Sequence, residues 1–417
     1  MKSNRRQFIK TSAMAGALGL LPANIINGEG DHNANTSDLE EAAMAKVLKT
    51  SLFTSPVKIE SIELFKYKDY YFVKSRSTDG AVGIAFTNNK VSYLYPLLRK
   101  QIIPFFIGKD ARDLESLIDG VYRYESNYKL SGITFWSCVA WVEFSLLDML
   151  GKIANKPVGA LLGDVIRKEI PIYTASGNRG TTPQEEVDIL AKKVAETGAK
   201  AVKFKVGGRM SNNEDSLAGR TEELIKVTRK VLGNNIEIQA DGNGSYDVAN
   251  GIRIGRLLED INAFMYEEPC PFDNLEETKK VADALTIPVS IGEEETSLRR
   301  FRWIIENNAA QIVQPDLHYN GGMIRATRVA RMAAKADKKI TIHISSGFGY
   351  VDMLHFASFT PNIGRFQEYK GSVNETGNYF DPPLRLKDGM INVPTGPGFG
   401  IKDTSELFKE GVKVIEC

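Results

Sequence analysis

The sequence predicts an α/β fold, a (β/α)8 barrel preceded by a smaller α+β unit. The first evidence is a series of short apolar runs that each end in a polar residue able to do chemistry: Asp241, Glu267, Glu293, Asp316, His343 and Glu368. Successive members are 26, 26, 23, 27 and 25 residues apart, close to the length of one strand, one helix and two short loops. Repeated strand–helix units imply parallel strands with right-handed crossovers, and seven or eight of them close most naturally into a barrel.

The second evidence is helical periodicity between these runs. Apolar residues recur at helical spacing in 221–233, 250–261 and 322–337, and each stretch ends near Gly, Asn or Asp. A first barrel strand is expected at 170–175, followed by a helix that begins near Thr182 with Pro183 and Glu185. We therefore place the barrel at 169–370. The carboxyl ends of its strands meet at one face, so the polar residues should converge there.

The chain is too long for one barrel of about 250 residues, since it has 417. Residues 57–89 alternate as three strands with turns at Lys68-Asp69 and Asp79-Gly80, and residues 91–163 turn helical. The end of that helical part is apolar on nearly all sides and should be deeply buried. We expect an N-terminal α+β domain at 51–168. A Pro- and Gly-rich segment at 371–417 should return to it.

The N-terminus is typical of an export signal. Arg5 and Arg6 precede an apolar run of small residues, the pattern of a Tat-type signal peptide, here placed at 1–28 and followed by a polar linker at 29–50. The alternative is a disordered basic tail. The apolar run is too short for a transmembrane helix, so no stable membrane insertion of the mature protein is expected. Tat cargo is exported folded, which predicts a periplasmic protein and often goes with a metal or cofactor loaded beforehand.

Composition argues against other classes of protein. The net charge is +1 and no basic stripe is present, so nucleic acid is not an expected partner. The three cysteines give no disulfide framework, and Cys138 and Cys270 are expected to be buried thiols. The histidines form no paired ligand motif; His318 is expected at most at the rim of the barrel, and His355 within a helix.

Three carboxylates predict a cation site. Asp241, Glu267 and Glu293 end three successive strands, so their side chains can point to one centre. Carboxylates gathered in one pocket repel each other unless they share protons or surround a cation. Oxygen ligands without Cys or nearby His favour Mg2+, which keeps positions open for water and substrate. The alternative is three unrelated acids that face solvent.

Acids and bases flank this group in the sequence. Lys203 and Lys205 are two apart on a strand and share a face, so each should lower the pKa of the other and yield a usable base. Asp316 and His343 end adjacent strands and can form a hydrogen-bonded second acid/base. Glu368, if kept protonated, could donate a hydrogen bond to a developing oxyanion.

Taken together, these motifs resemble the enolase superfamily and, within it, the mandelate racemase group. The resemblance covers nearly the whole mature chain. It is carried by KFK at 203–205, ADGNG at 240–244, YEEP at 266–269, IGEEE at 291–295, QPD at 314–316, HISSG at 343–347, QEY at 367–369 and the helix at 143–164.

The resemblance implies a modified, TIM-like barrel whose mouth is closed by an N-terminal capping domain. It implies one Mg2+ on Asp241, Glu267 and Glu293, with Lys205 as the proton-abstracting base. Lys203 would bind the substrate carboxylate, and the His343–Asp316 dyad would be the second acid/base. Three neighbouring acids remain alternatives as ligands: Glu268, Glu294 and Glu295.

The implied reaction is removal of the proton α to a carboxylate. We expect dehydration of an acid sugar to a 2-keto-3-deoxy acid; a racemase or epimerase of a 2-hydroxy acid, or a cycloisomerase of an anhydro or lactone sugar acid, uses the same parts. A non-catalytic sugar-acid binding protein is the alternative from another class. Asn243 and the cap residues Tyr70, Tyr71 and Lys74 are candidates for substrate binding, although an ordinary edge loop explains the last three equally well. Similar enzymes are often oligomers, so a homo-oligomer is expected.

Overall fold

Eight parallel strands form the barrel in the computed structural model, which describes residues 35–345, 349–370, 373–402, 404 and 409–415. The strands are β4 (Glu169–Ala175), β5 (Ala201–Lys205), β6 (Glu237–Asp241), β7 (Met265–Glu267), β8 (Val289–Ile291), β9 (Ile312–Val313), β10 (Lys339–Ile340) and β11 (Gln367–Tyr369). Neighbours pair in chain order from β4 to β10, and β11 pairs with β4. A bridge between Ile340 and Ile363 joins β10 to the segment before β11, which completes the ring.

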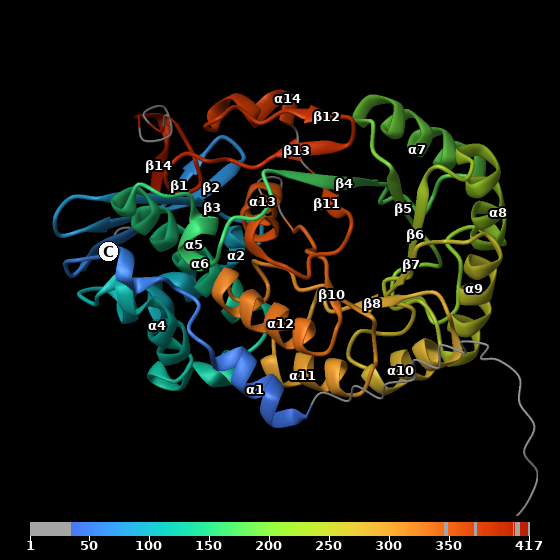
Figure 1. Cartoon of the computed structure of the whole chain (residues 1–417), viewed down its shortest axis with the longest axis horizontal. Helices are drawn as coiled ribbons and strands as arrows, with labels where there is room; N and C mark the ends of the chain where they lie inside the picture. Colours follow the sequence, from blue (N-terminus) through green and yellow to red (C-terminus); the bar gives the residue numbers. More distant parts are fainter. Residues whose placement is uncertain (1–34, 346–348, 371–372, 403, 405–408, 416–417) are drawn as a thin grey trace, which may run out of the picture. The chain divides into compact units, whose positions relative to one another are not determined.

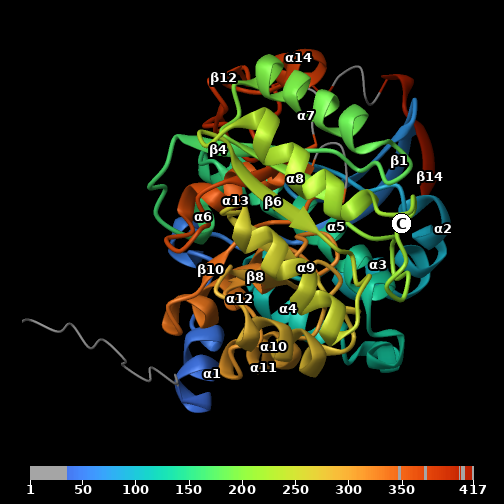
Figure 2. The same ribbon diagram turned by 90° about the vertical axis from the view of Figure 1, so that its right-hand side faces the viewer.

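A helix follows each of the first seven barrel strands and covers the outside of the ring (Figure 1). These helices are α7 (Pro183–Thr197), α8 (Arg220–Leu232), α9 (Val248–Asp260), α10 (Leu275–Ala284), α11 (Leu298–Glu306), α12 (Met323–Lys335) and α13 (Gly349–Phe359). Helix α7 begins with a capping box, in which Thr182 and Glu185 satisfy each other's backbone N–H groups. Figure 2 shows α7, α8 and α9 side by side, in agreement with the contacts between them. The predicted α/β barrel is confirmed.

The N-terminal unit combines an antiparallel sheet with helices. Its strands are β1 (Ile59–Tyr67), β2 (Tyr70–Ser77) and β3 (Val82–Phe86), joined by turns where the sequence predicted them. Its helices are α2 (Val91–Leu97), the π-helical turn η2 (Leu98–Ile102), α3 (Ile103–Phe106), α4 (Leu114–Val121), α5 (Ile133–Ala154) and α6 (Val158–Leu162), with short 3-10 turns between them. As predicted, α5 is deeply buried.

The C-terminal segment contacts both the barrel and the N-terminal sheet. Strand β13 (Met390–Asn392) of the hairpin with β12 (Leu386–Lys387) runs antiparallel to the start of β4. Strand β14 (Val412–Ile415) then pairs antiparallel with β1. The end of the described chain is thereby a strand of the N-terminal sheet. The limits of the domains at 51, 169 and 371 stay predictions.

Two buried carboxylates on α5 hold the units together. Asp148 accepts the backbone N–H of Ile84 in β3 and that of Phe399 in the C-terminal segment, both at 2.8 Å. Glu143 accepts the N–H groups of Met323 (2.6 Å) and Ile324 (2.9 Å), which begin barrel helix α12. A carboxylate at a helix N-terminus satisfies donors that otherwise lack partners. Helix α5 therefore links the N-terminal sheet, the C-terminal segment and the barrel.

Gly322 makes the contact between α5 and α12 possible. Its φ of +109° lies in a region that side chains other than glycine rarely adopt. A Cβ atom there would also overlap the carboxylate of Glu143. Glycine at this position lets α12 begin directly against α5.

Part of the polar linker predicted at 29–50 is instead a helix. Residues Thr36–Met44 form helix α1, capped by the side chain of Asn35. Its apolar residues Leu39 and Ala43 are buried, and α1 packs against α12 and α11. A short amphipathic stretch among many polar residues gives a weak sequence signal, because only two of its residues contact the core. Residues 1–34, including the predicted signal peptide, lie outside the described residues.

The predictions for two cysteines and one histidine are confirmed. Cys138 and Cys270 are buried free thiols, and His355 lies within α13. Among the described residues, α5 is the one helix with the length and apolar composition to cross a membrane, and 89% of its apolar window is buried inside the protein. That burial is typical of a core helix of a folded protein.

Asp148→Asn should lower the free energy of unfolding by about 1–3 kcal/mol. The amide nitrogen of Asn cannot accept a hydrogen bond, so the N–H of Ile84 or of Phe399 would be left buried without a partner. Urea denaturation measures the loss. Glu60→Gln is the matched control, because Glu60 forms an exposed ion pair with Arg76, worth about 0–1 kcal/mol. Equal stability of the two variants would contradict the linking role of α5.

Candidate active site

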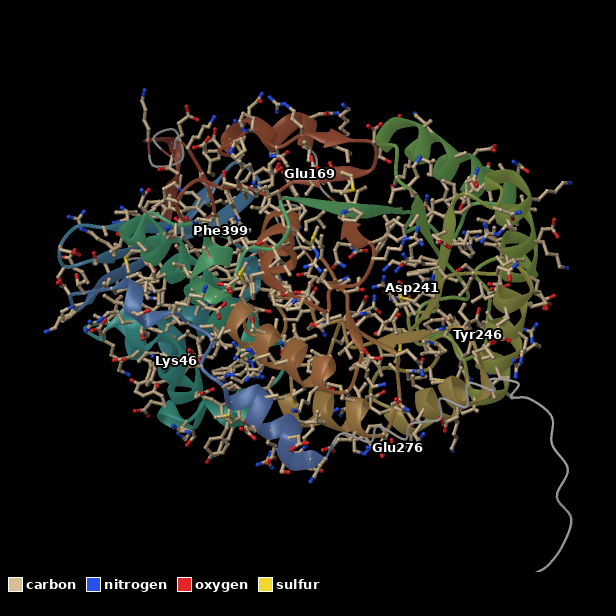
Figure 3. The ribbon with its side chains drawn as sticks, viewed as in Figure 1. Lys46, Glu169, Asp241, Tyr246, Glu276 and Phe399 are labelled. Carbon is tan, nitrogen blue, oxygen red and sulfur yellow. The ribbon has the colours of Figure 1, made fainter. Side chains whose placement is uncertain are left out.

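The strand register brings the predicted site residues to one face of the barrel. Lys205 lies opposite Asp241, and Asp241 opposite Glu267, in the pairs β5–β6 and β6–β7. Asp316 and His343 bridge just beyond β9 and β10. Figure 3 shows Asp241 inside the ring of strands, whereas Glu276 lies on the outer helix α10. All these residues end or follow parallel strands, so their side chains meet at the carboxyl-terminal face.

Asp241, Glu267 and Glu293 form a buried cluster of carboxylates. One carboxylate oxygen from each lies within 4.8 Å of the others. Burial and the charge of Asp241 raise the pKa of Glu267 to about 8. Burial also acts against the charge of Asp241, but Lys205 and Lys203 outweigh it and hold the pKa of Asp241 below its ordinary value. Three acids at this separation require protons or positive charge between them.

The cluster suits a hard divalent cation. It supplies three oxygen donors from three adjacent strands, and it contains no thiol or imidazole. Glu268, Glu293 and Glu294 form a second group within the same 4.8 Å limit. Burial and its acidic neighbours Glu293 and Glu294 raise the pKa of Glu268, which favours a shared proton there. Glu295, the third alternative ligand, instead accepts the N–H groups of Thr296 and Ser297 just before α11.

The ammonium group of Lys203 is surrounded by carboxylates. Its Nζ is 2.8 Å from both oxygens of Glu267, 3.4 Å from Glu368 and 3.7 Å from Asp241. Burial lowers the pKa of Lys203, but Glu267 and Glu368 outweigh this effect and raise it well above its ordinary value. The expectation that the two lysines lower each other's pKa is therefore wrong for Lys203. Three acids lie within 3.7 Å of its ammonium group and favour its charged form.

Lys205 lies on the Asp241 side of the cluster. Its Nζ contacts Oδ2 of Asp241, and its side chain is 12% exposed, against 1% for Lys203. The two lysines share a face of β5, as the spacing predicted. Lys205 is thus the more exposed of the two lysines.

His343 adjoins the cluster at Glu293 and is paired with Asp316. Asp316 Oδ2 is 2.7 Å from His343 Nδ1, and its other oxygen accepts the backbone N–H groups of His318 (2.7 Å) and Tyr319 (2.9 Å). Burial lowers the pKa of His343, but Glu293 and Asp316 raise it, to about 9 overall. Nε2 of His343, 3.5 Å from Glu293, faces the site. The dyad holds the ring in one orientation.

Glu368 does not fit the predicted role of a protonated donor. Burial raises its pKa, but Lys203, Lys370 and His343 outweigh burial and hold the pKa below its ordinary value. The carboxylate accepts the N–H of Ile344 at 2.9 Å. Glu368 is thus an anion held between two lysines.

Lys370 is a site residue that sequence reasoning missed. Its Nζ lies 3.3 Å from His343 Nε2, 3.2 Å from Glu368 and 3.0 Å from the carbonyl oxygen of Ile344. A signal was present, because Lys370 is two residues after Glu368 and so shares its side of the extended chain. It places a positive charge beside the nitrogen that faces the site.

The N-terminal unit reaches the site through the loop between β3 and α2. Asn88 is buried and donates to Ser345 Oγ (3.3 Å), which donates to Asp316 (3.2 Å). Lys90 lies 5.2 Å from the ring centre of Tyr319. These residues were also missed, although the polar sequence TNNK directly after a predicted strand was a usable signal.

The predicted cap residues belong to the hairpin of β1 and β2. Tyr70 is 42% exposed, the ring of Tyr71 packs under Lys66 at 5.6 Å, and Lys74 pairs with Glu63 at 3.4 Å. Those last two contacts stay within the N-terminal sheet. A role of these residues in substrate binding stays a prediction.

Asn243 is close to the carboxylate cluster, and its side chain already forms hydrogen bonds. Its backbone N–H donates to Asp241 (2.8 Å), and its side-chain oxygen accepts from Arg179 (2.8 Å) and Arg209 (3.4 Å). Its amide nitrogen donates to Glu268 at 3.3 Å. Asn243 therefore connects the carboxylates to two arginines at the face of the barrel.

His318 is deeper than predicted. It is buried, not at the rim, and accepts a hydrogen bond from Trp141 of α5 at 3.2 Å. Its other nitrogen lies 3.1 Å from Asp352 of α13. Two polar partners and an aromatic neighbour, Phe144, explain why a histidine is stable in this interior.

Comparison with known proteins identifies the family. Residues 186–406, more than half of the chain, match the family described as enolase C-terminal domain-like. The chain belongs to the enolase superfamily. Residues 2–22 match the Tat (twin-arginine translocation) pathway signal sequence, so the chain carries a signal of this type. The family match and the acidic cluster at the barrel face together support a divalent metal.

Curated relatives of the chain are named as dehydratases of sugar acids. An arabinonate dehydratase of Saccharolobus solfataricus is 26% identical over 75% of this chain and 82% of its own. An L-talarate/galactarate dehydratase of Salmonella typhimurium is 28% identical over 78% of each chain.

Solved structures share the fold. A proposed racemase from Roseobacter denitrificans superposes with a TM-score of 0.80 at 30% identity, over 86% of this chain and 99% of its own. A mandelate racemase/muconate lactonizing protein from Paracoccus denitrificans, solved in complex with magnesium, superposes with a TM-score of 0.77 at 25% identity and the same coverage.

Mg2+ binding should release protons and tighten as the pH rises to about 8. Burial and Asp241 raise the pKa of Glu267 to about 8, so below this pH a cation must displace a proton from its carboxylate. Above pH 8 the carboxylate is ionised and the dependence should level off. Calorimetric titration of Mg2+ into metal-free protein, in two buffers of different ionisation enthalpy, measures the affinity and the proton release.

Two variants of neighbouring residues sharpen this measurement. Glu293→Gln should weaken Mg2+ binding strongly, whereas Glu295→Gln should leave it unchanged, because Glu295 accepts the N–H groups of Thr296 and Ser297 instead of joining the cluster. Equal affinity in both variants would contradict the assignment of the metal ligands.

Proposed function

We propose that this protein catalyses Mg2+-dependent dehydration of an acid sugar to a 2-keto-3-deoxy acid. One observation carries the proposal: Lys205 adjoins the carboxylate cluster at Asp241, and the His343–Asp316 dyad adjoins it at Glu293. A substrate carboxylate held at the cluster then has a proton acceptor on one side and a proton donor on the other. The dehydratases among the relatives support the substrate class.

Asp241, Glu267 and Glu293 would hold one Mg2+. When bound, the cation supplies positive charge for a substrate carboxylate that gains electron density as the α-proton leaves. Lys203, which donates to Glu267 and forms an ion pair with Glu368, adds a fixed positive charge beside the same position. Glu368, as an anion, fixes this lysine rather than donating a proton.

The reaction needs two proton transfers by residues of the chain. The α C–H bond breaks and its proton passes to Nζ of Lys205 in the amine form. The electron pair forms the double bond between the α- and β-carbons, and the β C–O bond breaks. His343 Nε2 delivers a proton to the departing oxygen, which leaves as water. The resulting enol rearranges to the 2-keto-3-deoxy acid, so atoms and charge balance.

Racemisation or epimerisation is the second candidate, because it uses the same pair of residues and a proposed racemase is similar in structure. Cycloisomerisation of an anhydro or lactone sugar acid is a further use of these groups. Lys370 favours dehydration. A single imidazole suffices to return a proton to carbon, whereas a departing hydroxyl gains from a second positive donor beside His343 Nε2. A non-catalytic binding protein would need neither group.

The site of action proposed is the periplasm, reached through the Tat-type signal at 2–22. We propose that the mature protein is a homo-oligomer. It is not expected to insert stably into a membrane or to bind nucleic acid. A small-molecule acid sugar is the proposed substrate.

Lys205→Met and His343→Asn should each reduce formation of 2-keto acids about 10²–10⁴-fold, since each removes one acid/base. Incubation with Mg2+ and a panel of acid sugars, with detection of 2-keto acids, measures it. The control is Lys226→Met, an exposed lysine on α8. In D2O, His343→Asn should retain exchange of the α-proton through Lys205. If the unaltered protein shows exchange but forms no keto acid, a racemase replaces the dehydratase. If neither exchange nor keto acid is detected across the panel, the proposal of an enzyme fails.

Lys370→Gln should separate the two steps. Loss of a charged hydrogen-bond donor should slow dehydration about 10–100-fold. Exchange of the α-proton with D2O should change little, because Lys205 and the metal ligands stay in place. Lys279→Gln on α10, which breaks an ion pair with Asp283, is the matched control. Parallel losses of exchange and dehydration would show that Lys370 acts only on the structure of the site.

A further inference from the structure

Two arginines converge on one neutral oxygen at the face of the barrel. Arg179 follows β4 and Arg209 follows β5, and both donate to Oδ1 of Asn243, at 2.8 and 3.4 Å. Arg179 also donates to the carbonyl oxygen of Gly207 at 3.2 Å, which fixes its position. The three loops after β4, β5 and β6 thus bring two guanidinium groups together.

These arginines differ from the lysines of the site in having no acidic partner. Within the described ranges, neither Arg179 nor Arg209 forms an ion pair with Asp or Glu, whereas Lys203 and Lys205 both do. Asp241 attracts Arg179 through space but is in direct contact with Lys205. Two like charges side by side repel, so a shared anionic partner would stabilise both.

The position of the pair relates it to the substrate. The N–H of Asn243 donates to the proposed metal ligand Asp241 at 2.8 Å. Asn243 therefore links the arginines to the cluster at which the reacting carboxylate would bind. Arg179 is partly buried and Arg209 is exposed. A guanidinium group presents parallel N–H donors that match the two oxygens of a carboxylate or phosphate.

We propose that Arg179 and Arg209 form a subsite for a second anionic group, so that the preferred substrate is an acid sugar with negative charge at both ends. The inference rests on the proposed function, because it assumes that the first carboxylate binds at the cluster of Asp241, Glu267 and Glu293. The second group is a carboxylate in a sugar diacid or a phosphate in a phosphorylated sugar acid. If the arginines only fixed the loop of Asn243, their removal would affect all substrates alike.

Substrates matched in length and stereochemistry test the subsite. Six-carbon sugar diacids, the corresponding 6-phospho acids and the corresponding monoacids are compared by kcat/KM for keto-acid formation. The diacid or the phosphorylated acid should exceed the monoacid at least about 10-fold in the unaltered protein. If the diacid is the better substrate, the second anionic group is a carboxylate; if the phosphorylated acid is better, it is a phosphate. A monoacid that matches or exceeds both would overturn the proposal.

Arg209→Gln is the decisive variant, because Arg209 is exposed and its loss should not disturb folding. It should lower kcat/KM for the doubly charged substrate about 10–100-fold, mainly through KM, and leave the monoacid nearly unchanged. Arg253→Gln is the matched control, because it removes an exposed arginine of α9 that pairs with Glu222 of α8. Equal losses for all substrates, or the same values in both variants, would contradict the subsite.

A binding measurement separates failure of this inference from failure of the proposed function. Adipate and hexanoate have two and one carboxylates on six carbons and cannot be dehydrated. Mg2+-loaded protein should bind adipate more tightly in calorimetry, and Arg209→Gln should remove the difference. If no acid sugar reacts but this preference is present, the proposed reaction fails and the subsite stands. If monoacids react and adipate has no advantage, the reaction stands and the subsite fails.

Discussion

Repulsion among three buried carboxylates is the constraint on which the rest of this site depends. Asp241, Glu267 and Glu293 end adjacent strands, and the parallel register leaves them no way to separate. The fold meets the repulsion with positive charge from β5: Lys203 lies between Glu267 and Glu368, and Lys205 contacts Asp241. Each of these two ammonium groups thus lies beside an acid of the cluster. The divalent cation that we propose would add to this balance and would take over the contact of Lys205 with Asp241.

The two sides of the cluster are supported by different parts of the chain. Lys205 is fixed by the barrel itself, through the pairing of β5 and β6. His343 depends also on the N-terminal unit, because Asn88 contacts Ser345, and Ser345 contacts the Asp316 that orients the imidazole. Helix α5 reinforces this connection through Glu143 and the start of α12. The N-terminal unit therefore supports the pair that we propose as the second acid/base.

Strand spacing was a strong guide to the barrel and to the gathering of Asp241, Glu267 and Glu293, since a parallel register fixes which strand ends meet. It was a poor guide to charge. The expected pKa of Lys203 and protonation of Glu368 were wrong because both depend on distances to several acids and bases at once. The arginine pair was missed because loop side chains carry no periodicity, whereas Lys370 and Asn88 were missed although each directly follows a predicted strand. The helix at Thr36–Met44 was missed because only Leu39 and Ala43 are buried.

The location of the cation tests the central claim most directly. Crystals soaked in Mn2+, with anomalous diffraction data, reveal the metal independently of any assay. The account predicts one anomalous peak bound by an oxygen of each of Asp241, Glu267 and Glu293, at about 2.0–2.2 Å, with the ammonium of Lys203 still beside Glu368. A peak bound elsewhere, or no peak while Lys203 keeps both oxygens of Glu267, would contradict it.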